Sequence, residues 1–141
     1  MSNKETALVK PLPIPDGDSE VFWKALKTNK LLLQNCIDCG HIQYYQQAIC
    51  RLCQSKNLEH LQASGRGTIH SYSVVYRAPS AAFKEDVPYA VLLVDLEEGP
   101  RMISKLVGNM IDQLDFDKAV RLKVVQVSDD VYLPCFELDK E

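Results

Sequence analysis

The sequence lacks any long apolar run. No stretch approaches the roughly 20 consecutive apolar residues that a membrane-spanning helix needs. Residues 1–5 are mostly polar, and no apolar core of a secretory signal follows them, so we expect neither export nor a membrane anchor. The sequence therefore predicts a soluble, cytoplasmic protein, in which a reducing environment keeps cysteines free or bound to metal.

The sequence also lacks the motifs of common enzyme sites. It contains no G-x-S-x-G elbow, no phosphate-binding P-loop and no G-x-G-x-x-G fingerprint. Its three histidines, His41, His60 and His70, have no obvious nucleophile beside them in the sequence. His70 alternates with Thr68 and Tyr72, which predicts a hydrogen-bonded histidine on the face of a strand that all three share. We therefore expect the chain not to be an enzyme on its own.

Charge is unevenly distributed, although the net charge is only -3. Residues 20–84 carry eight Lys or Arg and three acidic residues, a net charge of +5. Residues 85–141 carry six basic and thirteen acidic residues, a net charge of -7. An anionic ligand is therefore expected to meet the first of these segments, although chance clustering on a solvated surface explains the asymmetry equally well.

The sequence does contain four cysteines with the spacing of a tetrahedral metal site. Cys36, Cys39, Cys50 and Cys53 form the pattern C-x2-C-x10-C-x2-C. Zn²⁺ binds such sets of thiolates, and each C-x2-C turn lets two sulfurs face one ion. Paired disulfides and a redox C-x-x-C are the alternatives, and the expected compartment and the double-pair spacing disfavour them. Because four thiolates complete a closed site, the predicted zinc is structural.

The two halves of this predicted site differ in the residue that follows them. Gly40 follows the first pair and can take the positive φ that such a turn needs, whereas Gln54 follows the second pair. The intervening residues 40–49 are enough for a short hairpin. His41 is the alternative zinc ligand, but we expect its side chain to point along this hairpin. The fifth cysteine, Cys135, lies in a predicted strand, where a buried structural thiol is expected.

Four segments are predicted along the chain, and together they make the fold class mainly β. These are an extended, proline-rich arm over residues 1–17, an amphipathic helix over 18–30, a rubredoxin-like zinc ribbon over 31–63 and a five-stranded OB-fold barrel over 64–141. Asp18 or Ser19 is expected to cap the helix, and Asn29 is expected to end it.

Five strands rich in β-branched and aromatic residues are predicted in the last segment. They are expected over residues 67–76, 89–96, 101–107, 119–127 and 131–138. Residues 97–100 and 128–130 predict tight turns, and residues 108–118 are long enough for a short helical crossover. Five strands with one longer connection indicate a Greek-key OB barrel.

Aromatic and basic residues are the candidates for contacting a partner surface or an anionic ligand. They are Phe22, Trp23, Lys24 and Lys27 of the helix, Arg66 at the entrance to the barrel, and Arg77 and Phe83 of the loop over residues 77–88. Trp23 and Phe83 also have a purely structural interpretation, as packing between helix and ribbon and as a plug of the barrel rim. Single-stranded nucleic-acid binding is the alternative function of an OB barrel, but a pI near 5.6 argues against a dominant phosphate contact.

An ordered set of short motifs extends over residues 20–138. It comprises residues 22–23, 32–34, 36–40, the second cysteine pair, 63–68, 71–75, 87–89 and 95–101. This combination resembles the acyl-CoA-associated zinc-ribbon OB-fold family known as domain of unknown function 35, although many members have a glycine where this chain has Gln54.

The resemblance implies a role as well as a fold. Members of this family look like non-catalytic accessory subunits of thiolase-fold enzymes, including thiolases, acyltransferases and steroid side-chain aldolases, with the active-site residues on the partner. The resemblance thus implies a hetero-oligomer with a thiolase-fold subunit and binding of CoA or acyl-CoA through that complex. An enzyme acting alone on acyl-CoA is a third hypothesis.

Overall fold

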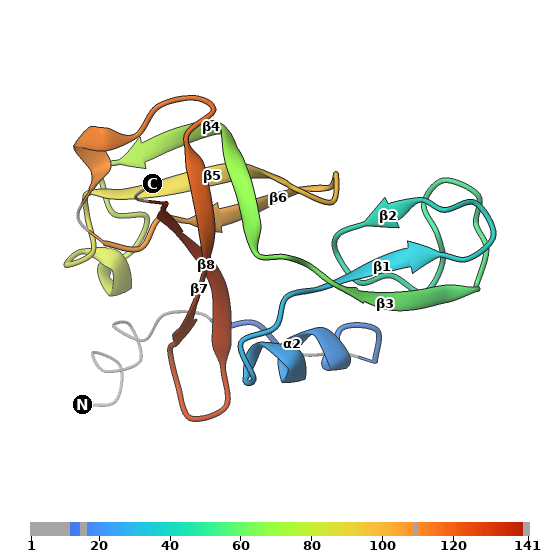
Figure 1. The fold of residues 1–141 in the computed structure, drawn as a ribbon. Coiled ribbons are helices and arrows are strands. Elements are labelled where there is room, and N and C mark those ends of the chain that lie inside the picture. The colour runs from blue at the N-terminus through green and yellow to red at the C-terminus, as the bar shows by residue number, and fades with distance from the viewer. Residues whose placement is uncertain (1–11, 15–16, 109, 140–141) are drawn as a thin grey trace.

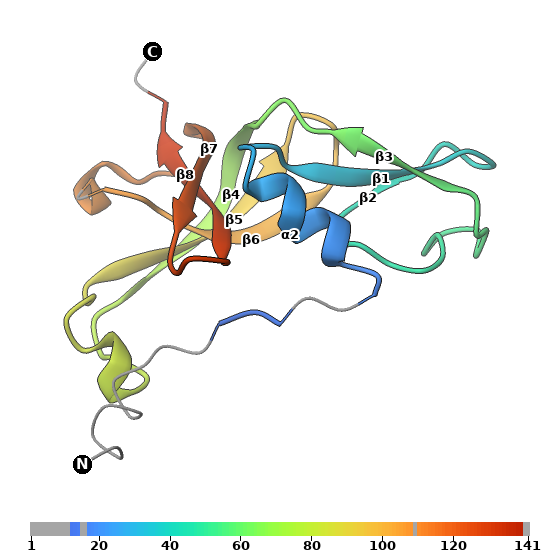
Figure 2. The same cartoon turned by 90° about the horizontal axis from the view of Figure 1, so that it is seen from below.

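The computed structural model describes residues 12–14, 17–108 and 110–139. Helix α2 (Glu20–Leu26) precedes a three-stranded sheet, and a five-stranded sheet then curls into a nearly closed barrel (Figure 1). Figure 2 shows the same arrangement from below, with α2 running between the two sheets. The fold is therefore mainly β, as predicted. Most of the expected arm over residues 1–17 lies outside the described residues.

The end of helix α2 agrees with the prediction, whereas Ser19, one of the two predicted caps, does not cap its start. Ser19 occupies the N-cap position but has a right-handed helical backbone and makes no side-chain capping hydrogen bond, so its predicted capping role is wrong. At the other end Asn29 has a φ of 64°. The Asn29 N–H donates to the Leu26 carbonyl at 3.0 Å, and the Lys30 N–H donates to the Ala25 carbonyl at 3.1 Å. This pair of bonds is a Schellman motif, which turns the chain toward the first strand.

The three-stranded sheet contains the segment predicted as a ribbon. Its strands β1 (Leu32–Cys36), β2 (Ile42–Gln43) and β3 (Leu58–Gln62) lie in the order β2-β1-β3, and both pairings are antiparallel. Strand β1 ends on Cys36, so the strand itself delivers the first of the four predicted metal ligands.

The barrel is built from the five strands that the sequence predicts. They are β4 (Arg66–Val75), β5 (Tyr89–Leu96), β6 (Arg101–Lys105), β7 (Ala119–Gln126) and β8 (Tyr132–Leu138), in the sheet order β6-β5-β4-β7-β8. A parallel bridge between Leu106 and Phe136 brings the two outer strands together, and the Val107 N–H donates to the Phe136 carbonyl at 2.8 Å. The connections hold two short 3-10 helices, η1 (Ala81–Phe83) and η2 (Ile111–Gln113).

A bulge in β4 changes which side chains face the core. The register with β5 shifts between Ile69 and Ser71, so Ile69 is buried and His70 is exposed, while Tyr72 packs against the core. The prediction that Thr68, His70 and Tyr72 share one face is therefore wrong, because an extra residue in a strand reverses the alternation beyond it.

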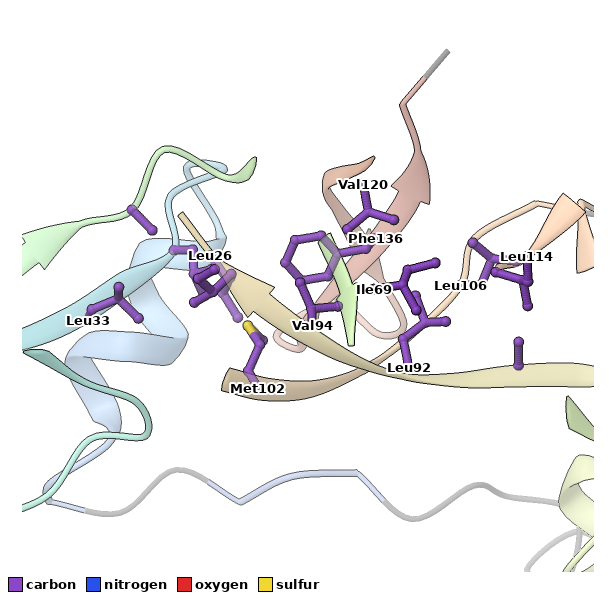
Figure 3. Close-up of a cluster of buried hydrophobic side chains, with 14 of the residues drawn as sticks. Leu26, Leu33, Ile69, Leu92, Val94, Met102, Leu106, Leu114, Val120 and Phe136 are labelled. Carbon is purple, nitrogen blue, oxygen red and sulfur yellow. The ribbon is translucent and has the colours of Figure 1, made fainter. Parts of the chain in front are cut away.

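One hydrophobic core joins the helix, the ribbon and the barrel. Phe22, Leu26, Leu31, Leu33 and Ala63 belong to the same buried cluster as the interior residues of the barrel. Figure 3 shows Met102 of β6 pointing toward Leu26 of α2, with Val94 and Phe136 on its other side. Among the described residues, no helix is both long enough and apolar enough to cross a membrane.

The connection between ribbon and barrel is only three residues long, residues 63–65. The Ala63 N–H donates to the Leu31 carbonyl of the ribbon side at 2.8 Å. The Ser64 N–H donates to a Glu98 carboxylate oxygen at 2.7 Å, and the Gly65 carbonyl accepts from the Leu122 N–H at 2.6 Å. The connection is thus bonded to both units that it joins.

Candidate functional site

The four predicted ligands converge on one point. The Sγ atoms of Cys36, Cys39, Cys50 and Cys53 all lie within 4.8 Å of one another. The Cys36 and Cys53 sulfurs are 3.5 Å apart, and the Cys39 and Cys50 sulfurs are 3.7 Å apart. A tetrahedron with zinc–sulfur bonds of about 2.3 Å has sulfur–sulfur distances of about 3.8 Å. The arrangement therefore fits a tetrahedral ion without rearrangement of the chain.

The two cysteine pairs sit in turns of the same shape. The Gly40 N–H donates to the Cys36 carbonyl at 2.8 Å, and the Gln54 N–H donates to the Cys50 carbonyl at 2.9 Å. Gly40 has a φ of 78° and Gln54 a φ of 66°. The second turn thus has the same left-handed conformation as the first. This conformation costs free energy at Gln54, because the Cβ atom of Gln54 approaches the backbone, whereas glycine has no Cβ atom.

Backbone N–H groups stabilise the sulfurs in their charged form. The N–H of Cys53, with that of Leu52 at 3.4 Å from the Cys50 sulfur, lowers the pKa of the Cys50 thiol to about 7. The Ser55 N–H lowers the pKa of Cys53, but neighbouring thiols, Cys36 first, and burial outweigh it and raise that pKa to about 12. Four thiolates this close repel one another unless a cation lies between them. The donor set therefore suits a metal ion such as Zn²⁺, which the four sulfurs would hold in a closed site.

His41 and Cys135, the two other residues considered as a metal ligand or a reactive thiol, lie outside the four-cysteine cluster. Among the described residues, the group that could share a metal ion contains the four cysteines and not His41. His41 acts through its backbone, because its carbonyl accepts from the Cys36 N–H at 2.8 Å. Cys135 is a free, buried thiol, as predicted. Burial raises the pKa of Cys135, and the charge of Lys105 only partly opposes that rise.

The ribbon contains three buried glutamines that sequence reasoning missed, and one of them, Gln43, positions the second turn. Gln34, Gln43 and Gln46 are all buried. The Gln43 side chain donates to Gln34 at 2.8 Å and to the Ile49 carbonyl at 3.2 Å, and its oxygen accepts from the Arg51 N–H at 2.9 Å. It therefore holds the residues on both sides of Cys50. The available signal was a pair of long amides in strands that are otherwise expected to be apolar.

Asp38 links the two halves of the site. Its carboxylate accepts a short hydrogen bond from the Ser55 hydroxyl and a second one, at 3.0 Å, from the Asn57 side-chain amide. These bonds, from Ser55 first, lower the pKa of Asp38. Since Asp38 lies in the first turn and Ser55 follows the second, the carboxylate fixes one turn against the other.

The aromatic residues of α2 pack against the ribbon. Phe22 is fully buried, with its ring 5.0 Å from that of Trp23 and 5.1 Å from that of Tyr45, both edge-to-face. The half-buried Trp23 donates its indole N–H to the Tyr45 hydroxyl at 2.9 Å. Phe22 is therefore a core residue, and its place among the contact candidates is corrected because no partner can reach it. Trp23 packs between helix and ribbon and keeps part of its ring exposed.

The basic candidates of the helix and the barrel entrance lie on the surface. Lys24 is paired with Glu20 at 3.0 Å, and Lys27 is 4.0 Å from Asp130. Arg66 lines a hollow of about 220 Å³ together with Arg121. The two arginines thus line one hollow between the helix end and the barrel, and Arg121 donates to the Glu137 carboxylate at 3.0 Å.

The remaining candidates, Arg77 and Phe83, are not near this hollow. They belong to the β4–β5 loop, at the end of the barrel away from the ribbon (Figure 1). The ring of Phe83 is half-buried, 6.3 Å from that of Tyr89. The contact residues proposed from the sequence are therefore distributed over two regions and do not form a single site.

A four-cysteine ribbon followed by an OB barrel defines a zinc-ribbon OB-fold protein, and comparisons identify its family. Residues 23–59 match the rubredoxin-like zinc ribbon domain of ChsH2, and residues 61–125 match the ChsH2 C-terminal OB-fold domain. In solved structures, a chain of an Ltp2-ChsH2(DUF35) aldolase aligns over 89% of this chain and 98% of its own length, with 30% identity and a TM-score of 0.79. The chain belongs to the DUF35 family of ChsH2-type proteins.

Two curated relatives carry different descriptions. A probable enoyl-CoA hydratase alpha subunit of Thermomonospora curvata is 30% identical over 91% of this chain and 40% of its own length. A DUF35 domain-containing scaffold protein of Methanothermobacter thermautotrophicus is 40% identical over 62% of this chain and 65% of its own length. This chain thus spans less than two thirds of either relative.

Proposed function

We propose that the chain is a non-catalytic accessory subunit of a complex that acts on CoA thioesters, and that its partner is a thiolase-fold enzyme. One observation carries the proposal: the likeness to a chain of an Ltp2-ChsH2(DUF35) aldolase extends over 89% of this chain. Relatives described as a scaffold protein and as an alpha subunit support the same role. In this role the chain organises the complex, and the reacting residues lie on the partner.

The metal centre supports this division of labour. Its four sulfurs surround one position and leave an ion no free coordination site for a substrate. Zinc bound there would stabilise the ribbon, including the aromatic cluster of Trp23 and Tyr45. The metal therefore contributes to the surface that a partner meets and not to a reaction step.

Contact with CoA is the finer part of the proposal. Arg66 lines a hollow, and a guanidinium group can bind phosphate in a bidentate manner, whereas Arg121 on the same hollow is paired with Glu137 at 3.0 Å. Lys27 is the C-cap residue of the neighbouring helix α2, and Arg77 and Lys84 line a separate hollow on the β4–β5 loop. We assign the hollow at Arg66 as the preferred contact for CoA phosphates, because this hollow adjoins the ribbon.

Co-expression tests the proposal. The chain is expressed with a thiolase-fold protein encoded beside its gene, and the two are purified through a tag on one of them. We expect a stable complex and acyl-CoA turnover that neither protein reaches alone, with a raised KM for acyl-CoA in an Arg66→Gln complex. Failure to co-elute, together with unchanged activity of the enzyme, would overturn the accessory role; an unchanged KM would overturn only the CoA contact.

A further inference from the structure

Strand β5 is apolar on both of its faces. Ala90, Leu92 and Val94 point into the barrel and are fully buried. Val91 and Leu93 alternate with them, so they point outward, and they are half-buried. In a sheet with one solvated face, the outward positions are normally polar, and strands that are apolar throughout are usually covered on both sides. The outer side of β5 therefore has the composition of a covered surface.

The neighbouring strands extend this apolar surface in register. Leu93 lies opposite Ile103 of β6, and Tyr89 lies opposite Val75 of β4. Ile103 is 63% exposed, which makes it one of the most exposed large apolar side chains of the described residues. We call this surface, formed by Val75, Tyr89, Val91, Leu93 and Ile103, the β5–β6 face.

Charged residues border the β5–β6 face at both ends. At one end Asp95 accepts from Arg101 at 2.6 Å and lies 3.6 Å from His70, so these charges are paired within the chain. At the other end the Lys105 ammonium lies 5.2 Å from the centre of the Tyr89 ring. Of the ion pairs found among the described residues, none includes Lys105. An apolar centre with a charged rim is the usual composition of a protein–protein interface.

A hollow adjoins the Lys105 end of this face. It has a volume of about 410 Å³. Its lining contains Tyr89 and Lys105, apolar residues that include Val107, Val125 and Leu133, and the acidic residues Glu85 and Asp86. A hollow of this kind beside an apolar face can receive one large side chain of a partner, the usual form of an interface anchor.

We propose that the β5–β6 face is the docking surface for the catalytic partner subunit. The matching surface of the partner is apolar at its centre, carries a carboxylate opposite Lys105, and inserts an apolar side chain into the adjoining hollow. A lysine that is outside the ion pairs of the described residues, beside an apolar surface, favours this occupant over a nucleic acid, which would need a cationic groove with stacking aromatics. The inference rests on the proposed function, because it assigns a place to the partner that the proposed function requires.

Surface variants test the inference in the co-expressed complex. Ile103→Glu places a charge at the centre of the face and is expected to weaken binding to the thiolase-fold partner by about tenfold or more, because that charge becomes buried without a counter-ion. Phe116→Glu is the matched control, since Phe116 is 61% exposed and lies on the crossover outside this face, and its affinity should stay within about twofold. Lys105→Glu should weaken binding and Lys105→Arg should preserve it, as measured by titration calorimetry at two salt concentrations.

The outcomes separate this inference from the proposed function. If the wild-type chain does not bind the partner, the proposed function fails. If the wild-type chain and Ile103→Glu bind equally well while circular dichroism shows both to be folded, the docking surface is wrong and the accessory role stands. Sedimentation of the chain alone gives a third measurement, its oligomeric state. If the wild-type chain is a dimer and Ile103→Glu is a monomer, the inference is overturned, because a second copy of the chain then covers the β5–β6 face.

Discussion

At the scale of single residues, the metal centre shows that a turn can keep its shape without its preferred residue. Gly40 and Gln54 hold equivalent positions after the two cysteine pairs, and both have a φ in the left-handed region. Glycine adopts this conformation freely, whereas a side chain with a Cβ atom resists it. The chain therefore carries local strain at Gln54 that the hydrogen bonds around Cys50 hold in place.

Replacing Gln54 with glycine should stabilise the folded chain. We expect Gln54→Gly to raise the free energy of unfolding by about 0.5–1 kcal/mol in the presence of zinc, because it removes the strain of the left-handed conformation. Urea unfolding followed by circular dichroism measures the change. Gly40→Ala is the matched opposite and should lower stability by about 1 kcal/mol. A Gln54→Gly chain that is no more stable than the wild type would contradict the strain at this position.

Removing one cysteine ligand should lower both the zinc content and the stability of the chain. With Cys39→Ser we expect zinc content to fall well below one ion per chain and the melting temperature to drop, because three thiolates hold zinc far more weakly than four. Elemental analysis and thermal unfolding provide the two readouts. Cys135→Ser serves as the control, since that thiol lies outside the cluster, and it should keep the metal. A Cys39→Ser chain that keeps the wild-type melting temperature would contradict a structural role for the ion.

The residues that could be predicted from the sequence follow from local spacing, whereas the missed residues depend on contacts that form only in the folded chain. The four cysteines were predictable because their spacing alone specifies the geometry of a tetrahedral site. Gln43 was not, because its role depends on Ile49 and Arg51, which approach it only after the hairpin has formed. The burial of Phe22 follows the helical pattern, which places it on the inward face with Ala25 and Leu26, but the pattern does not show that the ribbon covers the ring completely.

At the scale of secondary-structure elements, strands β4 and β5 approach closely at Gly67. A Cβ atom built on Gly67 would lie 2.7 Å from the Asp95 carbonyl oxygen and 2.7 Å from a Val94 methyl group. The first neighbour is backbone of the adjoining strand, so it cannot move aside alone. The absence of a side chain at Gly67 therefore sets the spacing at the start of the barrel.

An added methyl group at Gly67 should disrupt this strand pair. We expect Gly67→Ala to destabilise the chain by about 1–3 kcal/mol, the usual cost of overpacking a site that cannot relax. Gly17→Ala is the control, because a Cβ atom there meets nothing within 4 Å, and it should change stability by less than about 0.5 kcal/mol. The shift in the urea midpoint measures both. Equal midpoints for the two variants would show that β4 and β5 can separate locally.

The strands were more predictable than the side-chain faces. Runs of β-branched and aromatic residues between turn residues placed all five barrel strands to within about two residues, because such patterns are local. The orientation of His70 and Tyr72 was not predictable, because the bulge at Ile69 arises from pairing with β5, which is distant in the sequence.

At the scale of the whole molecule, the shared core makes the metal site and the barrel parts of one unit. Phe22 and Leu33 on the ribbon side are in the same buried cluster as Met102 and Phe136 of the barrel. Loss of the ribbon would expose one side of that cluster to water. The stability of the barrel should therefore depend on the occupancy of a site that lies outside it.

Thermal unfolding with zinc present should be a single transition. Fluorescence of Trp23, the only tryptophan, reports the helix and ribbon, and far-ultraviolet circular dichroism is dominated by the barrel strands. We expect the two signals to change at the same temperature, and a chelator to lower both midpoints together. A tryptophan transition that precedes loss of the barrel would contradict this coupling.

The three-residue connection between β3 and β4 gives the molecule a fixed span. Residues 63–65 are hydrogen-bonded to Leu31 on one side and to Glu98 and Leu122 on the other, so the connection does not act as a hinge. A partner that touches both the ribbon and the β5–β6 face would meet two contacts whose separation is already set, and the second contact would form with little further loss of entropy. The chain would then act as a rigid spacer, and the spacing between the subunits of a complex would be set by the length of this connection.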